Sequence, residues 1–166
     1  LLTKFSINKE DLLRSYLSAR PELNPEEAAT TMSADMWFRV PTIRIAEGHT
    51  VRSKAKTYMY LFTWESQFLG ATHAMDGVVF GNGAPFSFLA GFNSPERVSQ
   101  QMRKSWINFA KYGDPSFDKF RWPEYEQTQR FTASINDSFS LLTDPYLKQR
   151  VLLEPVLTAN WLDSGL

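Results

Sequence analysis

Histidine is the side chain best suited to proton transfer near neutral pH, and this sequence contains two of them. His73 lies in the small-residue segment Gly70-Ala71-Thr72-His73-Ala74-Met75-Asp76, shortly after an aromatic-rich predicted strand. Open α/β proteins carry catalytic groups on loops at the carboxyl ends of strands. His49 lies near the end of a predicted helix, where histidines commonly face solvent. We therefore favour His73 over His49, although position alone still favours a loop histidine without a role.

Other chemistries are excluded by what the sequence lacks. The absence of cysteine removes thiol nucleophiles, zinc ribbons and iron–sulfur ligation, and it favours an intracellular or bacterial protein. The sequence contains no GxSxG nucleophile elbow, no glycine-rich phosphate loop and no HExxH metal motif. We therefore expect neither a metal nor a cofactor.

Charge and hydropathy limit the partners. Lys and Arg total 18, as do Asp and Glu, so the surplus positive charge that nucleic-acid binding needs is missing. Apolar runs are too short to span a bilayer, so we expect no membrane segment. A cytoplasmic location is expected, with secretion not excluded.

Caps and apolar periodicity predict a mostly helical chain. Helices are expected from Asn8 to Pro21, from Asn24 to about Val51, from Ser94 to Gly113 and from Pro145 to Leu157. Pro41 predicts a break or a kink, with two helices that meet near Ser33–Pro41. A short apolar segment covers residues 75–80.

Two strands are predicted, at about residues 56–63 and 131–135. Two strands do not make a stable sheet, and both faces of the first are apolar or aromatic, as in a central strand. We therefore expect an α/β protein whose larger sheet lies outside this chain. The 166 residues are expected to form a single segment, 1–166, without a separate second domain. The sequence opens with Leu1-Leu2-Thr3-Lys4 and has no initiating Met, so we expect it to be an internal part of a longer sequence.

Four motifs occur in an order that resembles the type-B carboxylesterase and cholinesterase family. The segment GATHAMDGVVFGN is similar to the family's catalytic-histidine segment. Downstream, MRKSWINFAKYGDP resembles a family helix and Trp122-Pro123-x-Tyr125 resembles the WP-x-Y that follows it. Upstream, Ser33-Ala34-Asp35 with Phe38 and Pro41 resembles the entry to the helix before the strand.

The resemblance implies the C-terminal part of an α/β-hydrolase fold and a serine carboxylesterase that acts through an acyl-enzyme. His73 would supply the catalytic histidine. The nucleophilic Ser and the Glu or Asp that orients the imidazole would lie on the N-terminal part of the same enzyme, its expected partner. The substrate would be a small carboxylic ester, and this chain alone would be inactive.

Several neighbours of His73 have two interpretations. Asp76 is close enough to be mistaken for the triad acid, but we favour a helix cap or polar support for the pocket. Phe68, Leu69 and Met75 either line an apolar substrate pocket or pack in the core. Trp64 is expected in the core.

The predicted helix 94–113 should bury Met102, Trp106 and Phe109 in the core. Asp35 is expected to cap the helix that it begins or to pair with Lys148 or Arg150.

Two other functions remain open. One is a non-catalytic esterase-like protein that acts in binding or interaction. The other is a stand-alone helical interaction module, which predicts a complete core and no large exposed apolar surface. The residues specify neither the natural ester nor the oligomeric state.

Overall fold

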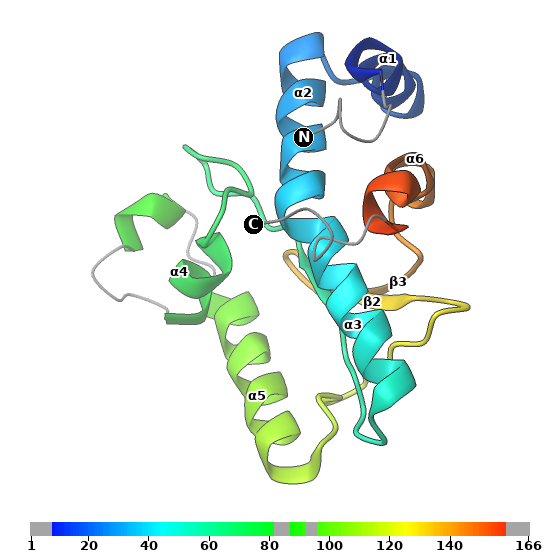
Figure 1. Cartoon of the computed structure of the whole chain (residues 1–166). Coiled ribbons are helices and arrows are strands. Elements are labelled where there is room, and N and C mark those ends of the chain that lie inside the picture. The colour runs from blue at the N-terminus through cyan, green and yellow to red at the C-terminus, as the bar shows by residue number, and fades with distance from the viewer. Residues whose placement is uncertain (1–7, 82–86, 92–95, 159–166) are drawn as a thin grey trace, which may run out of the picture. The chain divides into compact units, whose positions relative to one another are not determined.

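The computed structural model describes residues 8–81, 87–91 and 96–158, and it divides into two compact units (Figure 1). The helical unit combines Leu1–Val51 with Tyr146–Leu166, and the sheet unit is Arg52–Pro145. Each unit has a hydrophobic core of its own. The expected single domain over residues 1–166 stays a prediction.

The helical unit begins with two helices that the sequence predicts from their caps. Before α1 (Lys9–Ala19), the Asn8 side chain accepts hydrogen bonds from backbone N–H groups of the first turn. Before α2 (Pro25–Ala34), Asn24 and Glu27 form a reciprocal capping box. Both predicted helix starts are confirmed. The remaining elements of the unit are η2 (Asp35–Arg39), α3 (Val40–Arg52) and α6 (Leu147–Thr158).

Near Pro41, where the sequence predicts that two helices meet, the structure has a π-helical turn within one continuous helix. The segments α2, η2 and α3 follow one another without interruption (Figure 1), and Val40 donates its backbone N–H to the carbonyl of Asp35. Proline has no N–H to donate, and its ring crowds the preceding turn. A π turn widens the helix and accommodates an additional residue. The helix therefore continues through Pro41: its irregularity lies within the predicted interval Ser33–Pro41, but as a π turn and not as a break.

The core of the helical unit joins α1, α2, α3 and α6. Its buried members come from all four helices: Leu12, Tyr16, Ala28, Val40 and Leu153. Each lies on the inner face of its helix, as the amphipathic pattern requires.

Asp35 is buried inside this continuous helix, so the prediction that it caps a helix is wrong. Its carboxylate accepts a 2.8 Å hydrogen bond from the Tyr16 hydroxyl. It also accepts two from the Arg39 guanidinium, at 2.5 Å from Nε and 2.6 Å from Nη2. Arg39 lies four residues further along the same helical stretch and so reaches back onto Asp35. Of the two expected partners, Arg150 is buried and Lys148 is exposed.

The sheet unit contains a three-stranded sheet in the order β1-β2-β3. β1 (Tyr60–Phe62) pairs in parallel with β2 (Phe131–Ile135), with Tyr60 opposite Ala133. β2 pairs in antiparallel with β3 (Phe139–Thr143). The helices of this unit are α4 (Met75–Gly81), the 3₁₀ turn η3 (Ser87–Ala90) and α5 (Glu96–Tyr112), and Figure 1 shows α4 beside one end of α5.

The sequence analysis predicted two of these three strands. β2 has the predicted bounds, whereas β1 is confined to residues 60–62 of the expected 56–63. β3 was missed, although Asn136-Asp137-Ser138 between two apolar runs is a hairpin signal. In that turn the Asp137 N–H is bonded to the Asn136 side chain. Within the described chain β1 has one strand neighbour, so its other edge is available for a further strand.

The core of the sheet unit supports the expected roles of Trp64 and Met102, which are both buried. Trp106 packs against this core, as expected. Phe109 is 48% exposed and its ring meets Tyr58 edge-on, so its expected place in the core is wrong. It lies near the end of α5, beyond the part of the helix that the core covers. No helix in the described residues is long and apolar enough to cross a membrane.

Candidate active site

His73 lies on a short turn between a small antiparallel loop and α4. The loop is closed by reciprocal backbone hydrogen bonds of 3.1 Å between Ser66 and Gly70, and Gly70 adopts φ +62°. The His73 side chain is exposed. Ala74, the next residue, has φ +65°, a left-handed conformation that costs an alanine about 1–2 kcal/mol. The residue that follows the candidate histidine is therefore held in a strained conformation.

The His73 turn borders a pocket of about 430 Å³ within the sheet unit. Its lining comes from the loop, the turn, α4 and η3: Leu69, Thr72, His73, Ala74, Met75, Gly77, Val78 and Leu89. His73 is the titratable group of this lining, in which Thr72 is polar and the other side chains are apolar. An imidazole beside an apolar pocket suits proton transfer to or from an uncharged organic ligand.

The residues expected to bind substrate differ in how they relate to this pocket. Leu69 lines it and is half exposed. Met75 also lines it but is only 1% exposed and belongs to the core, so the two interpretations given for Met75 both describe it. Phe68 is 61% exposed and is not part of the lining. The structure thus brings Leu69 and Met75 together with His73 around one pocket.

Asp76 lies in the first turn of α4. One carboxylate oxygen accepts a 2.9 Å hydrogen bond from the Tyr60 hydroxyl of β1, and the other accepts one from the backbone N–H of Gly77. Burial, and then the hydrogen bond to Asp76 and its negative charge, raise the pKa of Tyr60 to about 12. Asp76 therefore connects the strand β1 to the turn that follows His73.

The sequence analysis did not single out several residues of this site, among them Val78, Leu89 and Tyr60. Val78 and Leu89 line the pocket and Tyr60 binds Asp76. The alternation of Tyr58, Tyr60 and Phe62 places these three on one face of the strand, but no local pattern connects that face to residue 76.

The described residues include no group of three His, Cys, Asp or Glu side chains that could hold a metal ion. His49 is an exposed residue of α3 in the helical unit.

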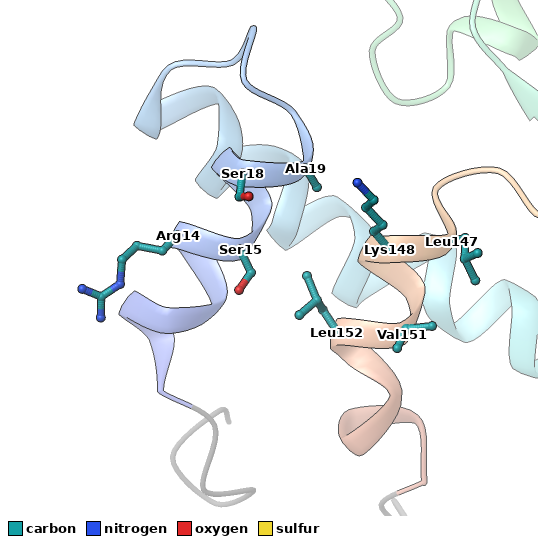
Figure 2. A pocket seen from close by; sticks show the side chains of 8 residues that line it. All are labelled: Arg14, Ser15, Ser18, Ala19, Leu147, Lys148, Val151 and Leu152. Carbon is teal, nitrogen blue, oxygen red and sulfur yellow. The ribbon is translucent and has the colours of Figure 1, made fainter.

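A second pocket, of about 600 Å³, lies between α1 and α6 of the helical unit (Figure 2). Figure 2 shows Ser15, Ser18 and Leu152 facing the space between the helices, while Arg14 extends away from it. Arg14 is paired with Asp11 at 2.5 Å. The lining of this pocket includes no His, Asp or Glu that would act as a general base for its serine hydroxyls. The His73 pocket is therefore the better candidate for a catalytic site.

Known structures contain a similar arrangement of helices and strands. The chain matches a structure entitled PNB esterase with a TM-score of 0.65 and 25% sequence identity, over 85% of this chain and 30% of that chain. It matches the carboxylesterase EST55 of Geobacillus stearothermophilus with a TM-score of 0.72 and 24% identity, over 86% of this chain and 31% of that chain. The fold is therefore part of an α/β-hydrolase fold of the carboxylesterase kind.

The sequence comparisons give the family. The model of the carboxylesterase family matches residues 4–152. Para-nitrobenzyl esterase of Bacillus subtilis (strain 168) is 28% identical over 160 residues, and human bile salt-activated lipase is 37% identical over 101 residues. These matches cover 87% and 56% of this chain. The chain belongs to the carboxylesterase family. It spans 32% of the length of the Bacillus enzyme and 13% of the human one.

Proposed function

We propose that this chain is the C-terminal part of a serine carboxylesterase and that His73 is its catalytic histidine. The observation that carries the proposal is the position of His73: an exposed imidazole, on a strained turn, beside an apolar pocket. This turn lies within the residues that match the carboxylesterase family. The reaction is the hydrolysis of a small carboxylic ester to a carboxylic acid and an alcohol.

In the proposed mechanism His73 transfers protons in both halves of the reaction. The imidazole takes the proton of a serine hydroxyl as the serine oxygen attacks the ester carbonyl carbon. It then gives this proton to the alkoxy oxygen as the C–O bond breaks, so that the alcohol leaves and the acyl group stays on the serine. In the second half His73 takes a proton from water, which attacks the acyl-serine, and returns it to the serine oxygen.

The apolar lining of the pocket would bind the hydrocarbon part of the ester. Leu69 and Met75 border His73 directly, with Val78 and Leu89 completing the apolar surface. Phe68 is exposed next to Leu69, and we propose that it covers bound substrate. Nothing in this lining selects a charged ester.

The serine, the acid and the oxyanion-hole N–H groups would come from an N-terminal part of the same enzyme. The available edge of β1 is compatible with a sheet that continues into such a part. This chain alone should not hydrolyse esters. We propose a cytoplasmic location from the lack of cysteine.

The test is turnover of para-nitrophenyl acetate by the intact protein that carries this sequence. Replacing His73 by Ala should lower kcat by about 10⁴-fold or more, because the proton transfers lose their base. His49→Ala is the matched control, since it removes the other exposed histidine of the chain. It should leave kcat within about twofold of the wild type, because nothing in the mechanism uses it.

The result has three distinguishable outcomes. Loss of turnover in His73→Ala alone supports the proposal. Normal turnover in His73→Ala removes this histidine from the mechanism. If the intact protein folds and binds an ester but does not hydrolyse it, the result favours the alternative, a non-catalytic esterase-like protein.

A further inference from the structure

We propose that Tyr60 is a positioning residue for His73: its hydroxyl holds Asp76, and Asp76 fixes the turn that carries the imidazole. This inference rests on the proposed function, because it assigns a role in the same reaction. Tyr60 itself would not touch the substrate.

Tyr60 is well placed to act as a fixed anchor. It begins β1 and pairs with Ala133 of β2, so the sheet fixes its backbone. Its ring packs edge-on against Trp106 of α5, with 5.2 Å between the ring centroids. Its hydroxyl then lies 2.9 Å from a carboxylate oxygen of Asp76. A side chain held at its backbone and its ring places its hydroxyl reproducibly.

Asp76 receives this hydrogen bond at the centre of the turn that follows His73. The Met75 N–H is bonded to the Thr72 carbonyl at 3.2 Å, and the Gly77 N–H to the Ala74 carbonyl at 3.1 Å. These bonds enclose His73 and the left-handed Ala74. A strained backbone conformation persists only where the surrounding contacts hold it. The Tyr60 hydroxyl supplies such a contact from outside the turn.

The hydroxyl is important to Asp76 because no described cation forms an ion pair with that carboxylate. Its described hydrogen bonds are those from Tyr60 and from the neighbouring Gly77 N–H. Tyr60 also stays protonated, and so remains a donor, at any pH at which an esterase is ordinarily assayed. Loss of the hydroxyl would leave Asp76 tethered by its own helix alone.

The experiment compares Tyr60→Phe with Tyr58→Phe in the intact protein. Both changes delete one hydroxyl from the same extended segment, and Tyr58 also packs edge-on against aromatic rings. Tyr60→Phe should lower kcat for para-nitrophenyl acetate by about tenfold with KM nearly unchanged, as expected when a reacting group is misplaced. Tyr58→Phe should leave both constants within about twofold, because no described group accepts a hydrogen bond from its hydroxyl.

A double-mutant cycle separates positioning from general stability. Asp76→Asn should also lower kcat, and the double variant Tyr60→Phe/Asp76→Asn should be no worse than the poorer single variant, because both remove the same interaction. Wild-type kcat in Tyr60→Phe, or losses that simply multiply in the double variant, would overturn the inference. Full activity in His73→Ala would instead contradict the proposed function itself. A failure of the proposed function is thus distinguishable from a failure of the inference about Tyr60.

Discussion

Each unit of the molecule contains a hydrogen bond from a tyrosine hydroxyl to an aspartate carboxylate. In the helical unit Tyr16 donates to Asp35 at 2.8 Å, and in the sheet unit Tyr60 donates to Asp76 at 2.9 Å. The surroundings differ. Asp35 is buried and is also paired with Arg39, whereas Asp76 is partly buried and has no ion-pair partner among the described residues.

The difference indicates what each pair does. A buried carboxylate is tolerated only when its charge is paired and hydrogen-bonded, so the Asp35 cluster is an element of packing. The cluster extends to Tyr146, whose ring faces the guanidinium groups of both Arg20 and Arg39 at 5.4 and 5.3 Å. Asp76 lies instead in the turn after an exposed histidine, next to an apolar pocket. The same two side chains thus stabilise one unit and orient a candidate catalytic group in the other.

The largest expected effect on stability comes from Asp35→Asn. The change removes the buried carboxylate charge that pairs with the largely buried Arg39 guanidinium, and we expect it to cost about 3 kcal/mol of unfolding free energy. Asp76→Asn breaks a half-exposed hydrogen bond and should cost less than about 1 kcal/mol. Denaturant unfolding of the intact variants measures both. Equal losses would contradict the distinction between a packing pair and an orienting pair.

A smaller effect on the unfolding free energy is expected at alkaline pH, from the titration of Tyr16. Burial, followed by the charge and hydrogen bond of Asp35, raises the pKa of Tyr16 above its usual value. The stabilisation is therefore complete below about pH 10 and is lost above it, because the unfolded chain then releases the Tyr16 proton while the folded chain retains it. Unfolding free energy should fall between about pH 9 and pH 11 in the wild type.

Tyr16→Phe and Tyr60→Phe should each flatten this alkaline decline by a similar amount, because the folded chain keeps both phenolic protons over this pH range. Urea unfolding at several pH values gives the slopes. A decline that is unchanged in Tyr16→Phe would show that Tyr16 titrates normally in the folded protein.

Much of the fold was predictable because its signals are local. Asn8 and Asn24 start helices through caps that lie within four residues of them, and the Gly113 N–H is bonded to the Phe109 carbonyl in the left-handed conformation expected after a helix. The family resemblance was also carried by contiguous motifs, and the family is confirmed.

The remaining features depend on contacts between distant residues. Tyr16 and Asp35 are 19 positions apart, and Tyr60 and Asp76 are 16 apart, so no periodicity connects either pair. The π turn before Pro41 also escaped prediction, because a proline signals a disturbed helix without specifying whether the helix breaks or widens. The roles of His73, Phe68, Leu69, Met75 and Asp76 stay predictions.

The central claim is that the imidazole of His73 transfers the proton, and rescue by free imidazole tests it most directly. In the intact protein His73→Gly should abolish hydrolysis of para-nitrophenyl acetate and leave space at the exposed turn. Adding imidazole should then restore part of the turnover in a saturable way, above the reaction of imidazole and ester alone. Wild-type turnover in His73→Gly without added imidazole would contradict the account.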